Sequence, residues 1–398
     1  MKNENLVPKV RFKGFSDPWE QRKLGELSNG FTYGLNASAK AYDGKHQYLR
    51  ITDIDDETRT FKQTHLTSPD IDFIRDNSYV LKLGDIVFTR TGASTGKTFI
   101  YRTADSIVYY AGFLIKMSVR EDIDSEFVFQ NTLTTSFNRF VKVMSQRSGQ
   151  PGINSKEYAR FKLYIPKLKE QVLVGNMLLL IDNLIAANED KLEQLKTLKK
   201  LMMQKIFSQE WRFKGFTDPW EQRKLGELFN ERKEKSSQGE LLSVTINSGI
   251  VKFDTLDRKN NSSADKSNYR VVRYGDIAYN SMRMWQGASG LSMYNGIVSP
   301  AYTVITPRTN TDAGFMAVNF KRKSMIQVFQ RNSQGLTSDT WNLKFPVLKN
   351  IRISIPKITE QQIITELFTV INNLIAANED KLNQLKELKK YLMQNMFV

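Results

Sequence analysis

One 24-residue segment occurs twice in this chain, 190 positions apart. The first copy, residues 184–207, reads LIAANEDKLEQLKTLKKLMMQKIF, and the second, residues 374–397, reads LIAANEDKLNQLKELKKYLMQNMF. In both copies apolar residues recur at alternating steps of four and three. This is the repeat of a helix that presents a narrow apolar seam to a partner helix. Because the chain carries two matched helices, we expect them to pair with each other as a coiled coil.

The predicted seam contains one asparagine in each helix. An asparagine at a seam position costs stability but fixes the register of the pair. The two asparagines could meet in a parallel pair or lie offset in an antiparallel one, and the sequence does not choose between these directions. The alternative is that each helix lies on a globular core. The residues expected to make the pairing contacts are Ile185, Asn188, Leu192 and Leu195 in the first helix, and Ile375, Asn378, Leu382 and Leu385 in the second.

A second duplicated segment opens each half of the chain. Residues 11–27 read RFKGFSDPWEQRKLGEL, and residues 212–228 repeat them with a single Ser-to-Thr change. The Asp-Pro pairs predict turns. We expect Trp19 and Trp220 to be packed anchors, each followed by a short helical turn, in the first half over residues 20–27. The N-terminal segment is also expected to pack near the C-terminal helix.

These repeats divide the chain into two variable halves and two helices. At 398 residues the chain is too long for one ordinary core. Both variable halves contain short strand-like runs and turns, with the clearest helices at 127–144 and 316–331. The predicted fold class is α+β with an internal pseudo-two-fold repeat. The predicted segments are a first domain at 1–165, a central helix at 166–208, a second domain at 209–355 and a C-terminal helix at 356–398.

The composition restricts the classes of function. A net charge of +16 and a pI near 9.6 point to a polyanionic partner, of which nucleic acid is the commonest, although a ribosome or an acidic membrane fits the charge equally well. Cysteine is absent, which excludes disulfides, thiolate metal sites and cysteine nucleophiles. The polar start predicts no secretory signal, and the most apolar run, 172–188, contains Asn176, Asp182 and Asn183. We therefore expect a cytoplasmic protein that spans no membrane.

The sequence offers little for catalysis. Its two histidines, His46 and His65, lie in the first half, so a duplicated histidine-based active site is excluded, and both are expected in loops or at the surface. Residues 92–98 resemble a phosphate-binding loop, but Thr91 replaces a required glycine and a strand-like run follows. The acidic cluster at 53–57 could hold Mg²⁺ in a nuclease, but the second half lacks an equivalent. A solvated turn is the better interpretation, and neither a catalytic nor a metal site is predicted.

Polar loops are better candidates for contacts with DNA. In the first half a loop rich in small residues follows a strand, and Arg283, Trp285 and Gln286 could play the same part in the second half. In each half a polar, glycine-bearing segment precedes the last strand. Arginine can read guanine, and glutamine or asparagine can read adenine, through paired hydrogen bonds. For each residue taken singly, a phosphate contact or an ordinary loop role is favoured over a base contact, so the paired segments are better candidates than their members. The candidate DNA contacts are Arg90, Thr91, Lys97, Arg147, Gln150 and Asn154 in the first half, and Arg283, Gln286, Arg331, Gln334 and Thr337 in the second.

The order of the repeats resembles the specificity subunit of Type I restriction–modification systems. The resemblance rests on the paired PWEQRKLGEL segments, the paired IPK-x-x-EQ junctions, the paired LIAANEDKL helices and the paired Gly-Asp-Ile strand entries. It implies that each variable half is a target-recognition domain for one half of a split, asymmetric site in double-stranded DNA. It further implies two modification subunits that methylate adenine with S-adenosylmethionine, and restriction subunits that use ATP and Mg²⁺ to translocate and cleave DNA. No such chemistry is expected from this chain.

The helices would then act as a spacer. As a helix, residues 181–206 would be about 39 Å long, close to the roughly 34–36 Å between major-groove sites one DNA turn apart. Two other classes of function stay open at this point. One is a stand-alone nuclease that uses the acidic cluster, and the other is a coiled-coil adaptor that binds only protein.

Overall fold

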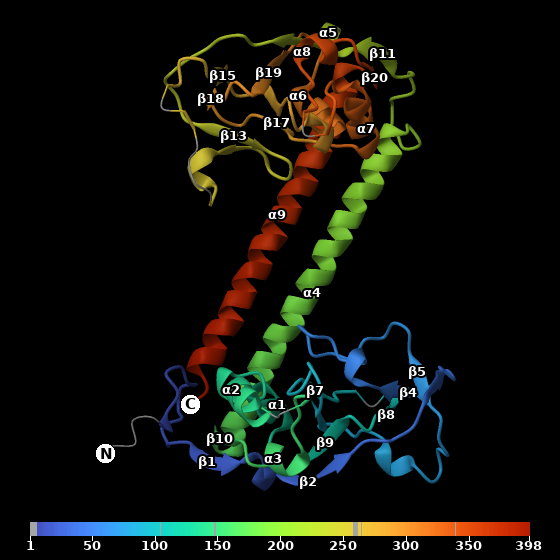
Figure 1. Ribbon diagram of the computed structural model, residues 1–398, viewed down its shortest axis with the longest axis vertical. Coiled ribbons are helices and arrows are strands. Elements are labelled where there is room, and N and C mark those ends of the chain that lie inside the picture. The colour runs from blue at the N-terminus through green and yellow to red at the C-terminus, as the bar shows by residue number, and fades with distance from the viewer. Residues whose placement is uncertain (1–5, 104, 147–148, 258–261, 264, 339) are drawn as a thin grey trace. The chain divides into compact units, whose positions relative to one another are not determined.

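The computed structural model describes residues 6–103, 105–146, 149–257, 262–263, 265–338 and 340–398. The chain forms two compact units. The first unit consists of Met1–Lys191 and Asn378–Val398, and the second of Leu192–Ala377. The chain passes from the first unit to the second inside helix α4 (Leu168–Phe207) and returns inside helix α9 (Ile358–Asn395) (Figure 1). Each unit therefore contains the beginning of one long helix and the end of the other.

The first unit is built around a four-stranded antiparallel sheet with the order β2-β9-β6-β7. Its strands are β2 (Ser28–Tyr33), β9 (Leu114–Val119), β6 (Ile86–Thr89) and β7 (Thr98–Ile100). Three strand pairs accompany it: β1 (Glu20–Lys23) with β10 (Lys162–Ile165), β3 (Ala39–Ala41) with β5 (Thr67–Pro69), and β4 (His46–Leu49) parallel to β8 (Ile107–Tyr110). The short helices are η2 (Leu24–Leu27), η3 (Ile51–Asp53), η4 (Asn77–Tyr79), α1 (Ser125–Asn131), α2 (Thr135–Met144) and α3 (Ser155–Tyr158).

The second unit repeats this plan. Its four-stranded antiparallel sheet has the order β12-β19-β16-β17, with β12 (Phe229–Glu231), β19 (Tyr302–Pro307), β16 (Ile277–Asn280) and β17 (Ser289–Leu291). The strand pairs are β11 (Glu221–Lys224) with β20 (Arg352–Ile355), β13 (Leu242–Thr245) with β14 (Gly249–Lys252), and β15 (Arg270–Val272) with β18 (Gly296–Val298). The short helices are α5 (Leu225–Leu228), η5 (Phe253–Thr255), η6 (Met284–Gln286), α6 (Ala313–Phe320), α7 (Lys323–Asn332) and α8 (Phe345–Leu348).

Three local predictions need correction. The helical turn expected over 20–27 begins as a strand, because Glu20–Lys23 pairs with β10, and only Leu24–Leu27 is helical. The helix expected at 127–144 is two helices, because the hydroxyl of Thr134 caps a new helix by accepting a hydrogen bond from the backbone of Phe137. The helix expected at 316–331 is likewise split into α6 and α7.

Each duplicated tryptophan packs on the end of a long helix. Trp19 is 2 % exposed, and its ring lies edge-on to Phe127 and to Phe397, just beyond the end of α9, with centroids 5.6 and 6.5 Å away. Trp220 lies edge-on to Phe207, the last residue of α4, with centroids 5.8 Å apart. The first half is thus anchored on the end of α9 and the second on the end of α4, as the repeat requires.

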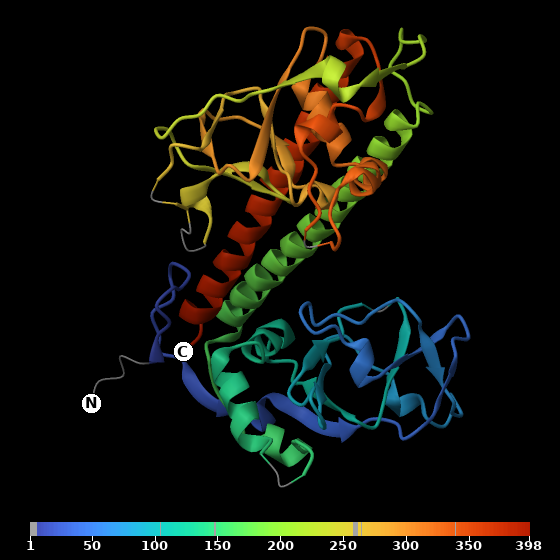
Figure 2. The ribbon, with the colours of Figure 1, turned by 45° about the horizontal axis from the view of Figure 1, so that its top comes forward.

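A duplicated ion pair holds the segment before each tryptophan. Arg11 donates two hydrogen bonds to Glu170, at 2.7 and 2.8 Å, and Arg212 does the same to Glu360. Both carboxylates lie in the first turn of a long helix, and their side chains are only 1 % and 2 % exposed. The backbone N–H of Val10 also donates to a carbonyl at the end of α9 at 2.9 Å, which confirms that the N-terminal segment packs near the C-terminal helix (Figures 1 and 2).

The two long helices pair in the antiparallel direction. Within the first unit, Lys389 pairs with Asp182 and Lys386 pairs with Glu189, both at 2.6 Å, so the residue number falls along α9 as it rises along α4. Asn188 therefore lies beside the turn that carries Lys386, about two helical turns from Asn378. The two asparagines are offset, and Asn188 donates to a carbonyl of its own helix at 2.7 Å.

The predicted seam is the less exposed side of both helices. Both asparagines are 7 % exposed, although each sits on a helix that is largely open to solvent. Among the predicted pairing residues, Asn188, Asn378 and Leu382 are buried, and Ile185, Leu192, Leu195, Ile375 and Leu385 are half-buried.

Removing one partner of the duplicated ion pair should destabilise the unit that contains it. We expect Glu170→Ala to lower the free energy of unfolding by on the order of 3 kcal/mol, because Arg11 would keep its burial and lose its counter-charge. Urea unfolding measures this loss. The matched control is Glu20→Ala, which removes an exposed ion pair with Arg22 and should cost at most about 1 kcal/mol. Equal losses in both variants would contradict a structural role for the buried pair.

Candidate nucleic-acid interface

A tight turn sets the start of the central strand in each unit. Gly84 and Gly275 adopt φ values of +82° and +86°, a conformation that glycine adopts without strain. The aspartates that follow, Asp85 and Asp276, each accept a hydrogen bond at 2.8 Å from the backbone N–H three residues earlier. This turn explains why the Gly-Asp-Ile entry occurs twice, and it starts β6 and β16 in the same way.

In each unit, the loop after this strand contacts the segment before the last short helix. In the first unit, the backbone N–H of Ile153 donates to the carbonyl of Arg90 at 2.9 Å, and that of Gly92 donates to Pro151 at 2.9 Å. In the second unit, the N–H of Leu343 donates to the carbonyl of Ser281 at 2.8 Å. Leu343 lies 190 positions after Ile153 and Ser281 lies 191 positions after Arg90, so this hydrogen bond repeats the first one. We call residues 90–97 with 149–154 the first loop pair, and residues 281–287 with 331–338 and 340–342 the second loop pair.

In both units a glycine allows the loop backbone to lie in close contact with a helix. Gly96 and Gly287 have φ values of +89° and +84°. A Cβ atom added to Gly96 would lie 2.5 Å from Val141 of α2, and one added to Gly287 would lie 3.0 Å from Ile326 of α7. The fold therefore fixes the backbone of both loops, while the side chains that they carry differ.

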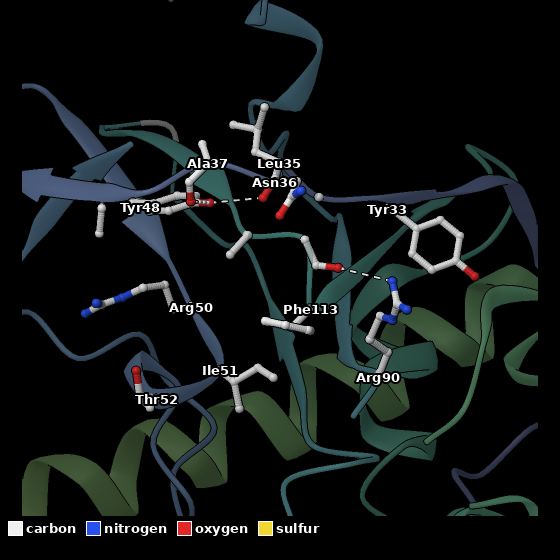
Figure 3. Close-up of a pocket in the computed structure, with 14 residues that line it drawn as sticks. Tyr33, Leu35, Asn36, Ala37, Tyr48, Arg50, Ile51, Thr52, Arg90 and Phe113 are labelled. Atoms are coloured by element: carbon white, nitrogen blue, oxygen red, sulfur yellow. Dashed lines mark hydrogen bonds between the residues drawn. The ribbon is translucent and has the colours of Figure 1, made fainter. Parts of the chain in front are cut away.

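A cavity of about 690 Å³ adjoins the first loop pair (Figure 3). The guanidinium of Arg90 lies 4.9 Å from the ring centroid of Tyr33 and donates to the carbonyl of Gly112 at 3.4 Å. Phe113 is 61 % exposed and lines the same cavity, with Arg50 on its other side. This arrangement of cations and exposed rings suits contact with a polyanion that carries aromatic bases.

The structure gives the first-half candidates different roles. Arg90 is half-buried, and Gln150 is exposed with its amide beside Gly92. Thr91 forms a β-bridge with Gly152. The two remaining described candidates, Lys97 and Asn154, have their side chains occupied within the fold. Arg147 lies outside the described residues.

Lys97 and Asn154 hold the frame of the first loop pair. Lys97 is 8 % exposed, and its ammonium contacts Asp56 at 2.5 Å and the carbonyl of Ile54 at 3.1 Å. Asn154 caps α3, because its Oδ1 accepts the N–H of Glu157 at 2.9 Å while the Glu157 carboxylate accepts the N–H of Asn154 at 2.8 Å. Lys97 is therefore held inside the fold, while Asn154 is exposed and uses its Oδ1 as the helix cap.

The second-half candidates are mostly open to solvent. Arg283, Arg331, Gln334 and Thr337 are exposed, and Gln286 is half-buried. Arg331 lies in the last turn of α7, while Gln334 exchanges two backbone hydrogen bonds with Asn342, at 3.0 and 2.8 Å.

Apart from Trp285, the candidates expected from the sequence do not include the aromatic residues in the second loop pair and beside the first. Trp341 packs edge-on against Trp285, with centroids 5.2 Å apart, and so joins the two segments of the second loop pair. In the first unit, Tyr33 and Phe113 reach the cavity from the end of β2 and from the segment before β9. No sequence signal identifies Tyr33 or Phe113, because strand pairing alone brings them beside Arg90.

The acidic cluster is used for local structure. Asp53 pairs with Arg50 at 2.8 Å, and Asp55 accepts turn N–H groups, that of Glu57 among them at 3.0 Å. Asp56 pairs with Lys97. Within the described part of the chain, no three histidine, aspartate or glutamate side chains gather as a metal site would require. Residues 92–97 form turns and then enter strand β7, as expected, and not a helix.

The first histidine differs from its prediction. His46 begins strand β4 and is half-buried, not a loop or surface residue. Its ring stacks on Phe73 with centroids 3.8 Å apart, and its Nδ1 lies 2.7 Å from a carboxylate oxygen of Asp43. His65 lies in an exposed loop with a φ of +56°.

A family model of the Type I restriction modification DNA specificity domain matches residues 16–197 and 217–387. The chain belongs to this family. Each match takes one variable half together with most of the long helix that follows it. The protein is therefore a DNA sequence-recognition subunit with two target-recognition domains, one in each unit.

Individual proteins and solved structures are similar to this chain. The MjaVIII specificity subunit of a Type I restriction enzyme from Methanocaldococcus jannaschii is 22 % identical over 347 residues, which cover 80 % of each chain. The crystal structure of the S subunit of a Type I system from M. genitalium has a TM-score of 0.65 at 13 % identity, covering 98 % of this chain and 99 % of that one, and shows that the fold is shared. The HsdS subunit from Thermoanaerobacter tengcongensis is more distant, with a TM-score of 0.45 at 16 % identity, covering 95 % and 96 % of the two chains.

A half-buried lysine supports the second loop pair of this specificity subunit. The ammonium of Lys321 donates to the carbonyls of Ile246 and Gly287, at 2.6 and 2.7 Å, and so ties the loop after β16 to the turn after β13. Burial, together with the positive charge of Lys199, lowers the pKa of Lys321 to about 8. A neutral amine keeps two N–H donors, which is the number that these two carbonyls accept.

The stability of the second unit should therefore rise at alkaline pH. Between pH 8 and the ordinary lysine pKa of 10.5, the folded chain binds fewer protons than the unfolded chain, so the free energy of unfolding increases with pH. From about pH 7.5 to about pH 9.5 we expect a gain of roughly 2 kcal/mol in urea unfolding, which Lys321→Met should abolish. Lys323→Met, at an exposed position, is the matched control. Parallel pH curves for the wild type and Lys321→Met would contradict this assignment.

Proposed function

We propose that this specificity subunit gives a Type I restriction–modification complex its target, and that each loop pair reads one half of a bipartite, asymmetric DNA site. The observation that carries the proposal is one backbone frame used twice with different side chains. Arg90 and Ser281 occupy equivalent places, and their carbonyls accept the same hydrogen bond. Two half-sites of different sequence require different side chains for base contacts, because those contacts depend on the bases. The backbone frame and the phosphate contacts can be the same in both units, because they carry no sequence information.

The charge and the surface of the loop pairs support this role. The chain carries an excess of 16 positive charges, which favours association with DNA without giving it sequence preference. The first loop pair presents Gln150 beside a cavity lined by arginine and aromatic rings, and the second presents Arg283 and Gln334 beside a tryptophan pair. These are the side-chain types that supply base readout and stacking.

A second apolar stripe on both long helices supports docking of partner subunits. Its members stand one residue before seam positions, which places them about 100° around each helix. They recur at coiled-coil spacing, and each member on one helix has its counterpart at the equivalent repeat position of the other. The exposed members are Leu173, Leu180, Leu184, Leu198 and Leu201 on α4, and Ile363, Val370, Leu374, Leu388 and Tyr391 on α9.

This second stripe fits two copies of one partner. An exposed apolar row with coiled-coil spacing is completed by another amphipathic helix. Because the stripe occurs twice, we propose that two modification subunits dock, each through a helix of its own. The exposed strands β1 and β11 have the same sequence, EQRK, although packing leaves most of their side chains free to vary. This identity supports two equivalent contacts with one kind of partner.

The second apolar stripe also explains why α4 is strongly apolar. Within the described residues, α4 is the one helix long and apolar enough to cross a membrane. Two apolar rows on one helix account for that character, since a helix that serves two sets of partner helices is apolar on two sides. We propose that the protein contacts no membrane and works in the cytoplasm, where the DNA is.

The chemistry of the complex belongs to other chains in this proposal. Modification subunits would bind S-adenosylmethionine and methylate adenine, and restriction subunits would use ATP and Mg²⁺ for translocation and cleavage. The specificity subunit would decide where both act.

Methylated-base sequencing of host DNA, with and without this gene, tests the proposed function. We expect one bipartite adenine motif to disappear when the gene is deleted and to return when it is restored. Methylation that is unchanged by deletion, in cells that produce the modification subunit, would contradict the proposal.

Lengthening the helix pair should change the spacing of the half-sites and leave their sequences unchanged. The helices run antiparallel and both connect the units, so matched heptads are inserted after Lys191 and Lys381. Each insertion adds about 10.5 Å of helix, or about three base pairs at 3.4 Å each. The methylated motif should gain a correspondingly longer spacer. An insertion in one helix alone is the control and should abolish methylation. An active double insertion with the original spacer would rule out the spacer role.

Charges on the second stripe should block assembly without unfolding the chain. Leu180 and Val370 are 59 % and 51 % exposed, so replacing both with aspartate removes partner contacts and little packing. We expect the Leu180→Asp, Val370→Asp variant to lose co-purification with the modification subunit while keeping its urea midpoint. The matched control is Ala186→Asp with Ala376→Asp, at exposed positions outside both stripes. Normal assembly of the stripe variant would show that the partners dock elsewhere.

A further inference from the structure

Arg90 is held rigidly without a carboxylate partner. Its backbone N–H donates to Phe113 at 3.1 Å, and its carbonyl accepts the N–H of Ile153. Its guanidinium stacks on Tyr33 and donates from one terminal nitrogen, Nη1, to Gly112. No carboxylate in the described part of the chain forms an ion pair with it, whereas Arg50, across the same cavity, is paired with Asp53. The Nε and Nη2 donors of Arg90 are left for a partner outside this chain.

A series of contacts fixes the direction of this guanidinium. The hydroxyl of Tyr33 accepts hydrogen bonds from the backbone N–H and from the side chain of Ser155, both at 3.2 Å. Ser155 is the first residue of α3, which Asn154 caps. Tyr33 is therefore positioned by a capped helix, and it supports the face of Arg90.

The free edge of such a group suits a guanine. Nε–H and Nη2–H of an arginine lie on one edge and donate in parallel, which matches the O6 and N7 acceptors that guanine presents in the major groove. Fixing the guanidinium plane lowers the entropy that is lost when both hydrogen bonds form. Phe113, exposed beside it, can exclude water or contact a neighbouring base.

A phosphate could accept the same two hydrogen bonds, but the repeat argues against it. Phosphate contacts carry no sequence information, so both units could use the same residue for them. The equivalent of Arg90 in the second unit is Ser281, which is buried and bonded through its hydroxyl to Thr303 at 2.8 Å. The backbone is the same at Arg90 and Ser281, whereas the side chain differs, as expected for a residue that reads a base.

We propose that Arg90 is a specificity-determining residue that reads one guanine in the half-site bound by the first unit, with Tyr33 as its positioning residue. This assignment rests on the proposed function and extends it to one base pair. It concerns the first unit alone, because Ser281 cannot make the same contact.

The test uses the complete complex with its modification subunits. Methylation is measured on DNA duplexes in which each base pair of both half-sites is replaced in turn. The wild type should lose roughly 10- to 100-fold in methylation rate when the guanine is replaced. Arg90→Gln should lose this preference at that single position and shift it towards adenine, which glutamine reads bidentately. Preferences in the second half-site should not change.

Companion variants separate readout from stability. Tyr33→Ala should weaken the preference at the same base pair, and Tyr33→Phe, which keeps the ring, should weaken it less. Arg75→Gln, at an exposed arginine paired with Asp76, is the matched control and should leave all preferences unchanged. Urea midpoints identify any variant that is unfolded.

Three outcomes would overturn the assignment. One is an unchanged preference in Arg90→Gln. Another is a uniform loss of binding on every sequence with a smaller salt dependence, which indicates a phosphate contact. The third is a first half-site without a G·C pair, which would overturn the role of Arg90 and leave the proposed function intact. A wild-type complex that methylates no specific motif would instead reject the proposed function itself.

Discussion

Neither unit can bury its core without the ends of both long helices. The core of the first unit contains Ile181 from α4 together with Leu392 and Met396 from the end of α9 and just beyond it, and all three are buried. The core of the second contains Phe207 from the other end of α4 and residues from the start of α9. Apolar burial is the main favourable term in folding, so the helices are part of both cores and not a separate linker.

The buried ion pairs and tryptophans follow from this constraint. Arg11 and Arg212 each reach a carboxylate in the first turn of a long helix, while Trp19 and Trp220 each cover the end of the other helix. One short duplicated segment therefore joins two helix termini in each unit. This dual contact explains why the segment is repeated almost without change, while the loops that face the proposed DNA partner are not.

Sequence patterns predict those features of the fold that depend on neighbouring residues in the chain. The heptad spacing indicated the long helices and their seam, and the duplicated segments indicated the two halves. The direction of pairing could not be predicted, because the Asp182–Lys389 pair joins one half of the chain to the far end of the other. The sequence predicts a helical turn at Glu20–Lys23, whereas its strand conformation depends on β10 at the opposite end of the first half, which local sequence does not report.

The candidate site was predicted as two sets of loops, but the roles of single residues were not. Lys97 and Asn154 have the polar side chains of DNA contacts, yet a tertiary contact buries the ammonium of Lys97, and the exposed Asn154 uses its Oδ1 to cap α3. Tyr33 reaches Arg90 only through strand pairing, which no local pattern in the sequence reports.

The division of the chain has a consequence for its synthesis on the ribosome. The first unit includes Asn378–Val398, so its core stays open until this segment has left the ribosome. The second unit ends at Ala377 and can close earlier, although it is made later. The domain that is synthesised first is thus completed last, and its exposed apolar surface must be protected from aggregation throughout translation.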